Sequence, residues 1–213
     1  MEVQVIFALS LAIFFFNEAQ SSTFMFKNNC PYTVWLGILT GAGPQLSSTG
    51  FELASQASLN LNVLPPWSGR FWGRTHCVTT DEFTLAPNNG KYFYDISLVD
   101  GFNLPLSVTP HGRSLGCNTT SCATDVNAVC PSELQVIKGL GGGVIACKSA
   151  CLAFKQPQHC CTGAYNSPAT CQPTKYSKIF KSQCPQAYSY AYDDKTSTFT
   201  CTGGANYVVT FCP

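Results

Sequence analysis

The cysteine count is the feature that most constrains the fold of this chain. The 213 residues include 13 cysteines, and eleven of these lie between Cys117 and Cys212. Cysteines at this density are typical of a disulfide framework made in an oxidising compartment. Because each disulfide uses two cysteines, an odd count leaves at least one thiol without a partner in the same chain.

The N-terminal segment predicts secretion. Residues 3–16 form an apolar run of signal-peptide length, too short for a comfortable membrane span. Ala19 and Ser21 stand where a signal peptidase requires small residues, and cleavage there starts the mature chain at Ser22. No later stretch has the length of a transmembrane helix. We therefore expect a signal peptide over residues 1–21, a secreted protein and no stable membrane insertion.

The composition indicates a rigid, loop-rich β protein. Charged residues make up 11% of the chain, aromatic residues 13%, and there are 17 glycines and 13 prolines. Without the signal peptide, twelve basic residues face nine acidic ones, a net charge of about +3. This charge is too small and too scattered for a nucleic-acid-binding surface, so no nucleic-acid partner is expected.

The first section of the mature chain has a strand pattern. Residues 23–27 and 58–63 alternate between polar and apolar, as half-buried strands do. Asn89-Gly90, between residues 83–85 and 92–94, predicts a hairpin, and Asp100-Gly101 is a second hairpin signal. Several short strands with turn signals favour a sandwich or flattened barrel.

The remainder of the chain divides into a cysteine-rich section and a second strand section. The section from Cys117 to Cys184 contains helix candidates over residues 144–154 and 175–182. The tail then returns to a strand pattern, and we expect residues 207–211 to pair back into the first sheet.

Three motifs that could carry chemistry are interpreted as structural. The segment Gly112–Gly116 matches GxSxG, but Pro110 before it and the cysteine-rich stretch after it do not provide the strand and helix of a nucleophile elbow. The histidines, His76, His111 and His159, lack zinc-ligand spacing, so neither a metal nor a cofactor is expected. Asn118 begins an N-glycosylation sequon in an expected loop.

Acidic residues from distant segments suggest a binding cleft. Six of the nine in the mature chain are Asp81, Glu82, Asp95, Asp100, Asp193 and Asp194. A cleft lined by carboxylates suits polyhydroxylated or cationic ligands, and two carboxylates can act together in glycoside hydrolysis. Each residue also has a structural interpretation, since Asp100 precedes a glycine in a turn and Asp193 lies in a polar loop. The residues alone leave both interpretations open.

Six segments along the mature chain resemble the thaumatin-like family of plant pathogenesis-related proteins. They are Phe26–Trp35, Arg70–Thr75, Tyr94–Asn103, His159–Gly163, Cys184–Tyr190 and Asn206–Pro213. The resemblance implies a mainly β fold: a flattened β-sandwich core domain over residues 22–116 and 185–213, and a disulfide-rich, partly helical lobe over 117–184. It also implies an electronegative cleft between them. Members of this family act against fungi; some bind β-1,3-glucans and some hydrolyse them weakly.

The resemblance also implies the residues of the cleft. These are Arg70, Glu82, Asp95, Asp100 and Asp193, which makes Asp81 and Asp194 neighbours. In members with glucanase activity, Glu82 corresponds to the general acid and Asp100 to the base or water-positioning carboxylate. Arg70 would keep the neighbouring carboxylates ionised, because a nearby cation lowers a carboxylate pKa.

The cysteines depart from the family pattern of sixteen in eight disulfides. A small insert that carries two of those bonds is missing between Cys77 and Glu82. The pairs implied by resemblance are Cys30–Cys212, Cys117–Cys201, Cys122–Cys184, Cys130–Cys147, Cys151–Cys160 and Cys161–Cys171. Cys77 then has no partner in its own chain. We expect a free thiol in a monomer, with a dimer linked through Cys77 as the alternative.

The resemblance, together with the signal peptide, implies a secreted defence protein of the plant apoplast that binds fungal cell-wall β-1,3-glucan through an acidic cleft. We expect binding to be partly kept and glucanase activity to be lost or very weak. The reason is that Glu82 lies at the shortened junction, where a one-residue register slip turns a side chain to the other face of the sheet. Two alternatives are a weak endo-β-1,3-glucanase using Glu82 and Asp100, and a truncated variant with an interaction or inhibitor role only.

Overall fold

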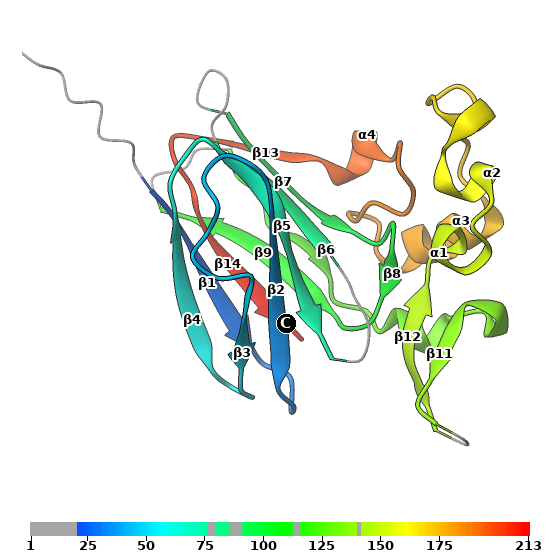
Figure 1. Cartoon of the computed structure of the whole chain (residues 1–213), viewed down its shortest axis with the longest axis horizontal. Coiled ribbons are helices and arrows are strands. Elements are labelled where there is room, and N and C mark those ends of the chain that lie inside the picture. The colour runs from blue at the N-terminus through cyan, green and yellow to red at the C-terminus, as the bar shows by residue number, and fades with distance from the viewer. Residues whose placement is uncertain (1–20, 76–79, 86–90, 113–115, 140–141) are drawn as a thin grey trace, which may run out of the picture.

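The protein consists of two packed β-sheets with a cross-linked lobe at one end (Figure 1). The computed structural model describes residues 21–75, 80–85, 91–112, 116–139 and 142–213, and of residues 80–84 it describes the backbone alone. In the described part of the chain, no helix is long and apolar enough to cross a membrane.

The first sheet has five strands and joins the two ends of the described chain. Its order is β10 (Thr120–Cys122), β9 (Leu106–His111), β14 (Asn206–Phe211), β1 (Ser22–Asn28) and β4 (Ser58–Val63). Strand β1 pairs in parallel with β14 and antiparallel with β4. The prediction that residues 207–211 return to the first sheet is confirmed, as are the strands predicted over 23–27 and 58–63.

The second sheet has six strands. Its order is β13 (Phe199–Thr202), β7 (Lys91–Ser97), β6 (Thr80–Leu85), β5 (Trp67–Arg74), β2 (Val34–Ala42) and β3 (Gly50–Leu53). Strands β6 and β7 pair antiparallel, with Thr84 opposite Phe93, which confirms the hairpin predicted from Asn89-Gly90. The turn itself lies outside the described residues.

Aromatic side chains form the core between the two sheets. Alternate residues of β1 and β5 point inward, so Phe24 and Phe26 meet Phe71, each with 5.0 Å between ring centroids. The Phe71 ring also stacks on that of Trp67 at 5.4 Å, and all four side chains are almost completely buried. This cluster holds the sheets face to face.

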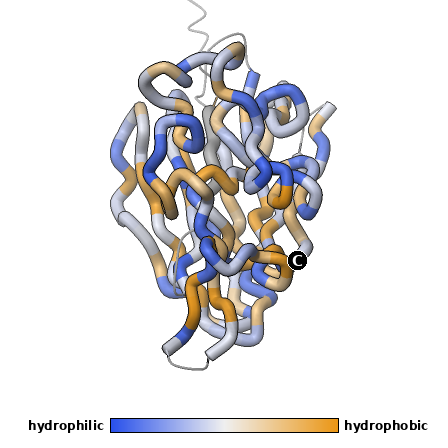
Figure 2. The backbone as a smooth tube through the Cα atoms, turned by 90° about the vertical axis from the view of Figure 1, so that its right-hand side faces the viewer, coloured by the Kyte–Doolittle hydropathy of each residue, from blue (hydrophilic) through white to orange (hydrophobic). Residues whose placement is uncertain are grey.

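The lobe combines a small sheet with short helices. Its sheet has the order β11 (Gln135–Ile137), β12 (Val144–Lys148) and β8 (Gly101–Phe102). Figure 2 shows apolar segments along the β11–β12 hairpin, which extends from the lobe. The helices of the lobe and the following segment are η1 (Val126–Val129), η2 (Ser132–Leu134), α1 (Ala150–Phe154), α2 (Pro157–Cys160), η3 (Gly163–Tyr165), α3 (Lys175–Gln183) and α4 (Asp194–Ser197).

Two local predictions need correction. The helix expected over residues 144–154 is half strand, because Val144 and Ile145 belong to β12 and the helix begins only after the Ser149 N-cap. The second helix candidate is confirmed as α3. Asp100-Gly101 ends a turn closed by the Gly101 N–H and the Leu98 carbonyl, but no hairpin follows. Strand β7 before the turn belongs to the six-stranded sheet, whereas β8, which begins at Gly101, belongs to the sheet of the lobe.

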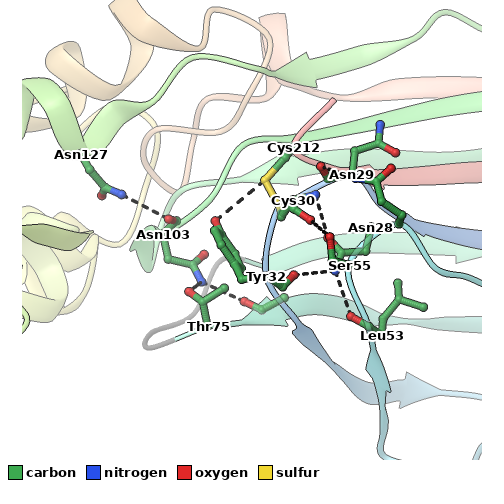
Figure 3. Close-up of a disulfide and its surroundings, with 12 residues drawn as sticks. Asn28, Asn29, Cys30, Tyr32, Leu53, Ser55, Thr75, Asn103, Asn127 and Cys212 are labelled. Atoms are coloured by element: carbon green, nitrogen blue, oxygen red, sulfur yellow. Dashed lines mark hydrogen bonds between the residues drawn. A yellow bond between two sulfur atoms is a disulfide. The ribbon is translucent and has the colours of Figure 1, made fainter.

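Six disulfides cross-link the described chain, and they are the six pairs that the family resemblance implies. Cys30–Cys212 ties β1 to β14 beside a polar cluster shown in Figure 3. There the Asn28 amide donates to the carbonyls of Tyr32 and Leu53, both at 2.9 Å. Cys77 lies outside the described residues, and its free state stays a prediction.

Candidate functional site

An open pocket of about 340 Å³ lies on the outer face of the six-stranded sheet, the face turned away from the five-stranded sheet. Its wall is formed by the chain from Tyr188 to Asp194. The lining residues are Arg70, Asp95, Ser97, Val99, Asp100, Tyr188, Ala191 and Asp194. The pocket therefore brings together segments more than a hundred residues apart in sequence.

Three of the five residues predicted for the cleft line this pocket. Arg70 points outward because its neighbours on β5, Gly69 and Phe71, face the core. Asp95 lies between two buried residues of β7 and shares the outer face by the same alternation. Asp100 lies in the turn after β7, whose closing hydrogen bond places it at the pocket edge.

The backbone register gives the position of Glu82. It lies opposite Arg70 on one side and opposite Asp95 on the other, in one cross-strand row. The sequence analysis expected that the shortened junction before Glu82 could shift the register of β6. In the structure, that register aligns position 82 with Arg70 and Asp95. The Glu82 side chain lies outside the described atoms, so its predicted role stays a prediction.

The sequence analysis placed Asp193 in the cleft and Asp194 beside it, but the structure shows the reverse arrangement. The Asp193 carboxylate lies 2.9 Å from the Lys181 ammonium and accepts hydrogen bonds from the Ser189 N–H and hydroxyl, also at 2.9 Å. These contacts hold the wall segment against α3, and Asp193 is absent from the pocket lining. Asp194, expected to be a neighbour, lines the pocket instead.

Tyr188 is a pocket residue that the sequence analysis did not single out, although one of the resembling segments contains it. Its backbone N–H donates a hydrogen bond to the Ile96 carbonyl at the end of β7, and its carbonyl accepts one from the Leu98 N–H just after that strand. Its hydroxyl donates to Asp194 Oδ1 at 2.8 Å and also contacts the Thr198 hydroxyl. Burial raises the Tyr188 pKa, and Asp194 and Asp95 raise it further, so the hydroxyl stays a neutral donor at physiological pH.

The other candidate sites from the sequence analysis are the glycosylation sequon, the GxSxG segment and a possible metal site. Asn118 is exposed between Gly116 and β10, and its glycosylation stays a prediction. Gly112 and Gly116 flank residues outside the described part of the chain, and no helix directly follows Gly116. Within the described residues, no group of three or more His, Cys, Asp or Glu side chains could hold a metal ion.

These features define a disulfide-stabilised β-sandwich protein with an open surface pocket lined by three carboxylates and one guanidinium. The family model described as "Thaumatin family" matches residues 28–82 and 78–213, so the chain belongs to the thaumatin family.

Named relatives cover nearly the whole chain. Thaumatin-like protein 1 of Pyrus pyrifolia is 55% identical over 239 residues, covering 96% of this chain and 98% of that protein. A protein of Prunus avium named glucan endo-1,3-beta-glucosidase is 53% identical, covering 98% of both. Pathogenesis-related protein 5 of Arabidopsis thaliana is 49% identical, covering 91% of both.

A solved structure supports the fold. The laminaripentaose-producing β-1,3-glucanase in complex with laminaritetraose superposes with a TM-score of 0.65 at 11% identity, covering 91% of this chain and 99% of that one. At this identity, the likeness concerns the fold alone.

The comparisons also agree with a missing insert. The alignment with the Pyrus pyrifolia protein spans 239 residues, more than the 213 of this chain, so that relative has residues that this chain lacks. The two segments matched by the family model meet at residues 78–82. This is the place where the cysteine pattern puts the missing segment.

Proposed function

We propose that the protein is a secreted defence protein of the plant apoplast that binds β-1,3-glucan of fungal cell walls through the pocket on the six-stranded sheet. The observation that carries this proposal is the convergence of Arg70, Asp95 and Asp100 on one open pocket beside the Tyr188–Asp194 pair. The chain's membership of a family that includes a protein named pathogenesis-related supports the defence role.

The pocket has the chemistry that a neutral polyol requires. Carboxylates accept hydrogen bonds from sugar hydroxyls, and the Arg70 guanidinium donates them. The lining holds three carboxylates and one guanidinium, so it disfavours an anionic ligand but leaves hydrogen-bonding groups of both kinds for a neutral one. Its open form suits a chain that enters and leaves, rather than a small molecule that must be enclosed.

Substitution of Asp100 by asparagine tests the proposal. The change keeps the size of the side chain and removes its charge, and a charge-assisted hydrogen bond is roughly twice as strong as a neutral one. We expect Asp100→Asn to weaken binding to insoluble β-1,3-glucan by about tenfold in a pull-down titration. Asp95→Asn should act in the same direction.

Asp125→Asn is the matched control. Asp125 is exposed in the lobe, outside the pocket lining, and caps η1 through an oxygen that asparagine retains. It should bind like the unsubstituted protein. Equal glucan binding by the Asp100 and Asp125 variants would contradict the proposed site, and absence of binding by the unsubstituted protein would contradict the function.

Weak endo-β-1,3-glucanase activity is a second candidate, favoured by the name of the Prunus avium relative. In this reaction Glu82 is the general acid and Asp100 the base. We expect release of reducing ends from a soluble β-1,3-glucan to be very slow, and Glu82→Gln to reduce it by at least about 100-fold. Hydrolysis that is unchanged in Glu82→Gln would exclude these roles.

A further inference from the structure

The outer face of the six-stranded sheet continues beyond the pocket as an aromatic surface. Strand β2 buries alternate side chains and leaves Trp35 and Leu39 exposed by 46% and 55%. On the neighbouring strand β5, Trp72 and Arg74 point to the same side. We call these four residues, Trp35, Leu39, Trp72 and Arg74, the tryptophan face.

The sheet holds the Trp72 ring in a defined place. Trp72 lies opposite Gly37 in the β2–β5 register, and a Cβ on Gly37 would come within 2.2 Å of the indole Cε2 and 2.5 Å of Cζ2 and Nε1. The indole therefore covers the glycine, which is buried although it lies on the outer face. The Arg74 guanidinium carbon lies 5.2 Å from the Trp72 ring centroid. A ring held in this way is pre-organised for contact.

The tryptophan face is continuous with the pocket. Leu39 lies opposite Arg70, and the same cross-strand row continues through position 82 to Asp95. At about 4.8 Å between strands, this row is about 14 Å long. Trp35 lies four residues from Leu39 along β2, about 13 Å away. The two surfaces thus form one long strip on a single sheet face.

We propose that the tryptophan face is a second part of the glucan-binding site, which receives the stretch of glucan chain that extends beyond the pocket. This inference rests on the proposed function. A glucose ring presents apolar C–H groups on its faces and hydroxyls at its edge, which match indole rings beside Arg74 and Arg70.

The charges around the face favour a neutral ligand. Trp35 lies between Glu52 on β3 and Arg74 on β5, so the negative and the positive charge beside it balance each other. Nucleic acids and anionic membrane surfaces bind to clusters of basic residues. The described residues of this strip form no such cluster, because Arg70 is accompanied there by Asp95. A long neutral polymer fits both the extent and the charge of the strip.

Oligosaccharide length provides the test. Titration calorimetry with laminaribiose and laminarihexaose is compared between the unsubstituted protein and Trp35→Ala, Trp72→Ala and Gly37→Ala. We expect each variant to bind the hexaose roughly threefold to tenfold more weakly, the range for loss of one aromatic contact. Binding of the biose, which we expect to occupy the pocket alone, should be unchanged. Gly37→Ala acts because its methyl group displaces the Trp72 ring.

Tyr165→Ala is the matched control, since Tyr165 is an aromatic residue of the lobe exposed by 38%. It should bind both sugars normally, whereas Asp100→Asn should weaken both. Trp35 is half exposed, so its variant remains folded and decides the test even where Trp72→Ala does not fold.

Three outcomes would overturn the inference. The first is equal hexaose affinity in the Trp35 variant and the unsubstituted protein while Asp100→Asn still weakens binding, which leaves the proposed function intact. The second is an equal loss for both sugars in the Trp35 variant. The third is failure of the unsubstituted protein to bind either sugar, which removes the proposed function as well.

Discussion

Phe71→Ala is expected to lower the free energy of unfolding by about 3–5 kcal/mol, the usual cost of removing a phenyl ring from a packed core. The Phe71 ring is fully buried and meets Phe24 and Phe26 from the opposite sheet. Its loss removes two of the ring contacts between β5 and β1 and leaves a cavity between the sheets. Since small proteins are stable by about 5–15 kcal/mol, the variant loses a large fraction of its stability.

Chemical denaturation with the disulfides intact measures this effect, followed by tryptophan fluorescence. Leu39→Ala on the neighbouring strand is the control, because Leu39 is 55% exposed and its truncation should change stability by no more than about 0.5 kcal/mol. A similar loss in both variants would show that Phe71 does not form the centre of the core.

Joint replacement of Cys30 and Cys212 by alanine is expected to have the second large effect. This disulfide spans 182 residues. With Cys117–Cys201 intact, the ring that it closes still contains about 100 residues, for which the chain-entropy description gives about 4.7 kcal/mol. Measured losses for native disulfides run from about 2 to 5 kcal/mol. The variant should therefore unfold at a markedly lower denaturant concentration.

The Cys151–Cys160 disulfide provides the comparison. It spans only 9 residues within the lobe, between α1 and α2. Because loop-closure entropy grows with loop length, its replacement by alanine should cost less than that of Cys30–Cys212. A greater loss from the short loop would mean that local packing, and not the length of the closed loop, determines the stabilisation.

Patterns of period two predicted the strands well, because each sheet has one buried and one exposed face. Leu59, Leu61 and Val63 alternate in sequence and also in burial. The turn at Asp100-Gly101 shows the limit of such patterns. The local signal for a turn is satisfied by the Leu98–Gly101 hydrogen bond, but the strands on its two sides join different sheets. Pairing between distant strands is not encoded in four residues.

The site was predictable in part. Arg70, Asp95 and Asp100 follow from motif resemblance combined with strand alternation, and the structure brings them to one pocket. The choice between Asp193 and Asp194 could not be made, because it depends on Lys181, a residue of α3 that reaches Asp193 from another element. The place of Trp72 over Gly37 depends likewise on the register between β2 and β5, which no local pattern determines.

The parallel pairing of β1 with β14 has a consequence for biosynthesis. Strand β1 has β4 available as a neighbour early, but its other edge stays open until residues 206–211 have left the ribosome. During that time an apolar strand with Phe24 and Phe26 has an unpaired edge, and Cys30 cannot form its native disulfide with Cys212. We therefore expect the five-stranded sheet to close only after translation of β14, with chaperones protecting its first strand until then.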